Sequence, residues 1–141
     1  AGKCEKTKGD GVHDCDDFLS NVQNLAEPWE QNSRKFLDGA VRIALVDTGG
    51  EPVCCSMHLI VLAEDRNQQG GGDGSRICKV ISNEERMGFV MMDVPHARAT
   101  YNPASGLDLA VPYRLYVDGI SSRQGVARIN VNLARGTISA R

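Results

Sequence analysis

Hydrophobic residues fall at every second position over much of the chain after residue 40. The segments 40–47 and 53–63 both follow this period of two, and the second keeps several apolar residues on its other face too. Such alternation places successive side chains on opposite faces of a β-strand. We therefore expect two strands joined by the turn at 47–50. The second should lie inside its sheet and be covered on both sides for part of its length.

The same alternation continues to the C-terminus. Further strands are expected over 77–82, 88–94, 107–117 and 127–133, and a short one over 137–140. Pro112 cannot donate a hydrogen bond to a neighbouring strand, so its strand should lie at a sheet edge or bulge there. Six or seven strands separated by turns predict a mainly β fold, an antiparallel β-sandwich or small barrel.

The residues before 40 follow a different pattern. Residues 1–13 are polar and contain glycine, which is typical of a loose N-terminal arm. In the helical segment 14–38, apolar residues recur at three- and four-residue spacing behind an acidic start and predict a short helix over 16–26, ending before Pro28. The apolar positions of this helix are Phe18, Leu19, Val22, Leu25 and Ala26. With the sandwich of 40–141, the chain 1–141 should form one domain.

The stretch VRIALVDTGGEPVCCSMHLIVLA resembles the opening hairpin of transthyretin-like and immunoglobulin-like sandwich domains. In those domains a strand ends in Asp, turns through Gly and resumes at Pro-Val, as residues 41–63 do here. The resemblance implies a sandwich fold and no particular function, because many unrelated proteins share such hairpins.

Charge is unevenly distributed along the 141 residues. The net charge of −2 argues against a general nucleic-acid binder. Residues 1–38 carry five basic and eight acidic side chains, whereas residues 107–141 carry five arginines and two acids. The two ends either complement each other across one domain or leave a basic face for a partner.

Five cysteines in a small domain favour an oxidising compartment. We expect Cys4–Cys15 to close the arm and Cys54–Cys78 to join two outward strand faces, with Cys55 buried and free. A cytosolic protein would instead use such cysteines as metal ligands or core residues.

Other features also favour a periplasmic or secreted protein. The chain opens at Ala-Gly-Lys, which fits a removed leader or a trimmed N-terminus. No apolar run is long enough to span a bilayer, so no membrane insertion is expected.

No motif for a reaction, cofactor or metal is found. The cysteine and histidine spacings do not match structural zinc sites. The segment 65–76 resembles half of a calcium loop, but Arg76 stands where the closing acid should be. A hydrolase remains an alternative if His96, oriented by Asp93 or Asn102, activates a cysteine.

The segment 95–106 is longer than a hairpin turn requires and is expected to be a recognition loop. It carries residue types that anchor protein interfaces, and the expected partner-binding residues are His96, Arg98, Tyr101 and Asn102. We expect an exported protein-binding module, such as an inhibitor or immunity-type protein of the bacterial envelope. A structural subunit of a surface or secretion assembly, docking at the strand around Pro112, is the other alternative.

Overall fold

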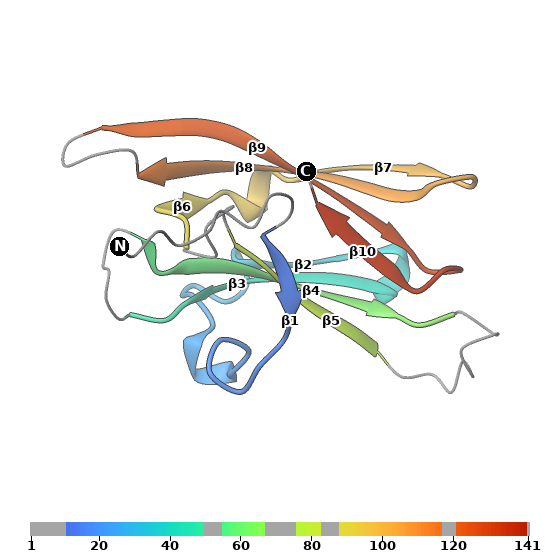
Figure 1. The fold of residues 1–141 in the computed structure, drawn as a ribbon, viewed down its shortest axis with the longest axis horizontal. Helices are drawn as coiled ribbons and strands as arrows, with labels where there is room; N and C mark the ends of the chain where they lie inside the picture. The colour runs from blue at the N-terminus through green and yellow to red at the C-terminus, as the bar shows by residue number, and fades with distance from the viewer. Residues whose placement is uncertain (1–10, 50–54, 67–75, 83–87, 117–120, 141) are drawn as a thin grey trace, which may run out of the picture.

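The computed structural model describes residues 11–49, 55–66, 76–82, 88–116 and 121–140. These residues form ten strands in two antiparallel sheets, stacked one above the other (Figure 1). The mainly β, antiparallel class is confirmed. The strand count of six or seven was wrong, because three short strands have no recognisable alternation of their own.

Sheet A has the strand order β1-β5-β4-β3-β2. Its strands are β1 (Val12–Asp14), β2 (Ser33–Phe36), β3 (Val41–Asp47), β4 (Met57–Glu64) and β5 (Arg76–Ile81). Two short 3-10 turns, η1 (Val22–Asn24) and η2 (Leu37–Gly39), lie on either side of β2 in the sequence.

Sheet B has the order β10-β9-β8-β6, and β7 pairs with another part of β8. The strands are β6 (Met91–Met92), β7 (Arg98–Asn102), β8 (Gly106–Tyr116), β9 (Ser122–Asn132) and β10 (Thr137–Ala140). A 3-10 turn, η5 (Val94–His96), separates β6 from β7.

The main core lies between the sheets and is built from the alternating positions that the sequence indicated. Val41, Ile43 and Leu59 of sheet A and Leu109 and Ile129 of sheet B are almost completely buried. Burial of one such side chain contributes about 1.5–3 kcal/mol, which explains why the period of two fixes which face turns inward.

A second, smaller cluster lies on the outer face of sheet A. Val46, Ile60 and Val80 are buried there, with Leu19 and Leu62 packed against them. The prediction that the strand of residues 53–63 is covered on both sides for part of its length is therefore confirmed.

The predicted helix over 16–26 does not form. The segment instead runs from β1 through a turn into η1, and Leu25 bridges to Val46 of β3. Asp16 Oδ1 accepts hydrogen bonds from the amides of Phe18 (3.0 Å) and Leu19 (2.7 Å), as a helix cap does, but the turn does not continue. The Phe18 carbonyl, which in a helix would accept from the amide four residues on, instead accepts from Asn24 Nδ2 at 2.7 Å. The loose arm of 1–13 also needs correction, because Val12 and His13 belong to β1.

The prediction that Pro112 marks an edge strand or a bulge was wrong. β8 lies inside sheet B, between β9 and the pair β6 and β7. The Pro112 carbonyl accepts from Asp93 N at 2.8 Å, just where the neighbouring strand changes from β7 to β6. Since a residue's N and O point to the same side of an antiparallel strand, the missing N–H costs no hydrogen bond to β9.

Candidate functional site: the outer face of sheet B

The outer face of sheet B is hollowed into a groove with a volume of about 1240 Å³. We call it the sheet-B groove; its lining includes Arg98, Ala110, Pro112, Val126, Arg128 and Asn130. These side chains occupy the positions that alternate with the buried ones, so the period of two that builds the core also presents this face to solvent.

Two arginines lie in one row across the groove. In the strand register, Arg98 of β7 is opposite Ala110 of β8, and Ala110 is opposite Arg128 of β9. Neighbouring strands lie about 4.8 Å apart, so the Cα atoms of the two arginines are about 10 Å apart, with only a methyl group between them. Both residues are exposed. Neither guanidinium has an ion-pair or hydrogen-bonding partner among the described residues.

The acidic residue of the groove does not neutralise these arginines. Asp108 Oδ1 instead accepts a hydrogen bond of 2.9 Å from Asn130 Nδ2, which also donates to the Ser105 carbonyl. The row of arginines therefore keeps a positive charge that a ligand can meet.

A tight hairpin positions Arg98. Gly106 has φ of 98°, and a Cβ there would lie 2.4 Å from the Val131 carbonyl oxygen, so only glycine fits where β8 begins. Asn102 Oδ1 accepts from Ala104 N at 2.9 Å and closes the turn between β7 and β8. The expected recognition loop at 95–106 is thus largely a strand and its hairpin.

Arg34 of β2 fixes the other end of β7. Its Nη1 donates to the Ala97 carbonyl at 2.6 Å and to the Val94 carbonyl at 3.4 Å, and its guanidinium lies 4.9 Å from the centre of the Phe36 ring. A side chain of sheet A therefore holds the residue directly before Arg98. Sequence reasoning missed Arg34, since nothing near it in the chain indicates a contact some 60 residues away.

The structure separates the four residues that the sequence grouped as a binding loop. His96 and Arg98 line the sheet-B groove. Tyr101 is opposite Leu107, a core residue, so it lies on the other face of β7, where it is 57% exposed. Asn102 closes the turn. Sequence reasoning also missed Arg128, because it lies 30 residues from Arg98 and reaches the same row only through strand pairing.

A histidine–carboxylate pair lies at the rim of the groove. His96 Nδ1 is 2.8 Å from Asp93 Oδ2, as one form of the hydrolase hypothesis expected. That hypothesis also needs a thiol, and all three described cysteines are disulfide-bonded. Cys54, another cysteine that could act as the nucleophile, lies outside the described residues.

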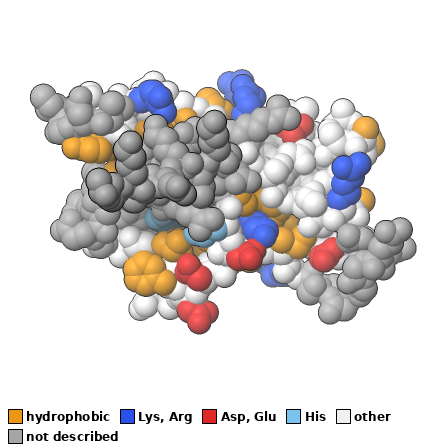
Figure 2. All heavy atoms as spheres, in the orientation of Figure 1, with side chains coloured by type: hydrophobic (Ala, Val, Ile, Leu, Met, Phe, Trp, Pro, Cys, Tyr) orange, Lys and Arg blue, Asp and Glu red, His pale blue; other side chains and the backbone are white. Residues whose placement is uncertain are grey.

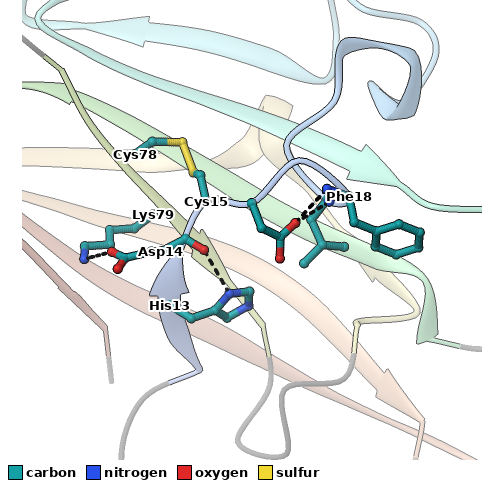
Figure 3. The surroundings of a disulfide bond; sticks show 8 residues. His13, Asp14, Cys15, Phe18, Cys78 and Lys79 are labelled. Atoms are coloured by element: carbon teal, nitrogen blue, oxygen red, sulfur yellow. Dashed lines mark hydrogen bonds and ion pairs between the residues drawn. A yellow bond between two sulfur atoms is a disulfide. The ribbon is translucent and has the colours of Figure 1, made fainter.

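The disulfide pairing differs from the one expected. Cys15 bonds to Cys78 with their Cα atoms 5.5 Å apart (Figure 3), so the pairs Cys4–Cys15 and Cys54–Cys78 were wrong. The reason is strand register: Asp14 is opposite Lys79, which places the next residue of the chain beside Cys78. Cys55 is buried as expected but disulfide-bonded rather than free. The cysteine bonded to Cys55 lies outside the described residues, which contain neither Cys4 nor Cys54.

A second polar cluster lies on the outer face of sheet A. Ser82 Oγ lies 2.7 Å from His58 Nδ1 and 3.1 Å from His13 Nε2. Burial lowers the pKa of His58, and the nearby His13 lowers it further. Ser82 is only 4% exposed, so this cluster joins β1 to β4 and β5 and does not present a hydroxyl to a substrate.

Pairing between the acidic and basic ends of the chain is not seen in the ion pairs of the described residues. Arg66–Glu64, Lys79–Asp14 and His96–Asp93 are such pairs, and none of these three joins residues 11–38 to 107–140. The acidic segment lies on the outer side of sheet A and the arginine row on the outer side of sheet B. In the view of Figure 2 acidic side chains lie mostly in the lower half, whereas basic ones lie along the upper edge, at the right and in the centre.

Within the described residues, no group of three or more His, Cys, Asp or Glu side chains is arranged to hold a metal ion. Most of the calcium-loop-like segment 65–76 lies outside them. No helix among the described residues has the length and hydrophobicity to cross a membrane. No protein-family model, curated protein or solved structure matches this chain significantly.

Proposed function

We propose that this chain is an exported protein-binding module that holds an acidic surface of a partner protein in the sheet-B groove. The observation that carries the proposal is the row Arg98–Ala110–Arg128, in which two exposed arginines have no partner among the described residues. An inhibitor or immunity-type protein is one form that such a module takes.

The chemistry of the row suits carboxylates. A guanidinium binds a carboxylate through two parallel hydrogen bonds, and arginine is enriched at protein interfaces. Ala110, Pro112 and Val126 add apolar surface beside the charges, and Val126 is 45% exposed. An interface with charged anchors beside an apolar strip gives both orientation and buried area.

The groove is also held in place before any partner binds. Gly106 and Asn102 fix one end of β7, and Arg34 fixes the other. A preorganised site loses little conformational entropy on binding, which favours affinity.

Export is supported by the cysteines. Cys15–Cys78 and the bonded Cys55 require an oxidising environment to persist, as in the periplasm or outside the cell. The hydrolase alternative lacks a thiol among the described residues.

The test uses charge reversal with a matched control. Tagged protein is used to capture partners from its native extract, and the double variant R98E/R128E is compared with K35E/R76E, which reverses two exposed charges on sheet A. A charge-assisted hydrogen bond contributes about 1.5–3 kcal/mol, so loss of the arginine pair should weaken a specific complex at least tenfold. The control should retain the partner. Equal retention by both variants would place recognition elsewhere.

A further inference from the structure

The segment 15–24, here called the Phe18 loop, displays an aromatic ring on the outer side of sheet A. Phe18 is 72% exposed and Val22 70% exposed, although both are large apolar side chains. In Figure 3 the Phe18 ring points away from the disulfide. Aromatic side chains, phenylalanine among them, are enriched at protein interfaces, so an exposed phenyl ring can serve as an anchor for a partner.

Hydrogen bonds hold this loop in shape. Asp16 Oδ1 accepts from the amides of Phe18 and Leu19, and the Phe18 carbonyl accepts from Asn24 Nδ2 at 2.7 Å. Asn21 Oδ1 accepts from Gln23 N at 3.0 Å. The ring is therefore presented by a backbone with several local restraints.

Both ends of the loop are tied to sheet A. Cys15 is bonded to Cys78 of β5, and Leu25 bridges to Val46 of β3. Leu19 packs into the small cluster beneath the loop. The Phe18 ring thus stands on a base that is preorganised for docking.

The chemistry of the loop complements that of the sheet-B groove. Asp16 and Asp17 are exposed next to Phe18, which makes an apolar anchor with an acidic rim. The groove offers the reverse arrangement, an apolar strip including Val126 beside Arg98 and Arg128. The two surfaces lie on opposite sides of the sandwich, so one molecule cannot bring its own loop to its own groove (Figure 1).

We propose that the Phe18 loop of one copy docks in the sheet-B groove of a second copy. This inference rests on the proposed function, and the occupant of the sheet-B groove is then another molecule of the same chain, bound head to tail. The contact is heterologous, so each added copy leaves one loop and one groove free, and the assembly grows as an open chain unless the rotation between copies closes a ring. Such growth is what a subunit of a surface assembly requires.

Two variants that complement each other test the proposal. The loop variant D17R/F18A keeps an intact groove, and the groove variant R98E/R128E keeps an intact loop. All four substituted residues are exposed, so both proteins should fold, which far-UV circular dichroism checks. Sedimentation equilibrium then gives the mean mass at about 20 mM and about 500 mM NaCl, where screening is weak and strong.

At low salt the mean mass of the parent and of K35E/R76E should rise with concentration, and at high salt this rise should largely disappear. Each loop or groove variant alone should be a monomer, with self-affinity weakened roughly tenfold or more. An equal mixture of the two should form a heterodimer and stop there, because only one competent loop–groove pair remains. A symmetric interface gives no such complementation.

A parent protein that stays monomeric at low salt, or a mixture without heterodimer, would overturn the head-to-tail contact. In that case, loss of a captured partner from R98E/R128E would still support the proposed function. Self-association without any other captured partner would show that the groove serves the second copy alone.

Discussion

The outer faces of both sheets are formed by alternating residues, but one of these faces is covered and the other is open to solvent. On sheet A, the second face carries Val46, Ile60 and Val80, and the chain folds back to cover them. On sheet B, the corresponding face carries Arg98, Arg128 and polar residues, and the chain leaves it open as a groove. The period of two identifies strands in both sheets. The residue types on the second face decide whether that face becomes core or binding surface.

The largest expected effect separates the covered face from the open one. Val80→Asp places a carboxylate among the buried apolar side chains of the covered cluster and should lower the free energy of unfolding by about 4 kcal/mol. Val126→Asp makes the same change in the open groove and should alter stability by less than about 0.5 kcal/mol. Urea denaturation measures both. Similar losses for the two variants would mean that the groove is not open in solution.

A smaller effect separates two neighbours within the segment that covers sheet A. Leu19→Ala removes a side chain packed on the small cluster and should cost about 2 kcal/mol of folding stability. Phe18→Ala should cost close to nothing, because its ring is exposed. The denaturation midpoints of the two variants measure this difference. A larger loss of stability for Phe18→Ala than for Leu19→Ala would show that the ring is buried.

The smallest effect is a pH dependence that belongs to sheet A. Burial lowers the pKa of His58 in the folded state below its value of about 6.5 in the unfolded chain. The unfolded chain therefore binds a proton first, and the stability that comes from a neutral His58 is full above about pH 6.5 and is lost as the pH falls toward the lower folded pKa.

Urea denaturation at a series of pH values between about 7.5 and 5 measures this slope. His58→Asn removes the titrating group and should flatten the slope in that window. A slope that is unchanged in His58→Asn would assign the pH dependence to another group.

Much of the main framework could be predicted from the sequence. The strands β3, β4, β8 and β9 are long enough for their alternation to stand out, and Val41, Ile43, Leu107 and Leu109 face inward as the pattern requires. Each inward position needs an apolar residue, so the burial pattern of a long strand is visible in its sequence.

The short strands could not be predicted in this way. β1 has three residues and β2 has four, and β7 is exposed along its whole length, so none carries a readable apolar face. Each becomes a strand because a longer neighbour offers it hydrogen-bonding partners. The helix predicted over 16–26 failed for a related reason: apolar spacing alone does not show that Asn24 Nδ2 takes the Phe18 carbonyl, which a longer helix would have used.

The class of fold, the inward faces of the long strands and the double covering of β4 follow from the sequence, because they depend on which residues alternate with which. The Cys15–Cys78 pair, the shared hydroxyl of Ser82 and the row that joins Arg98 to Arg128 follow only from the assembled sheets. Each of these depends on strand order and register, which set distances between residues that are remote in the chain. Such distances arise only when the whole sheet is assembled.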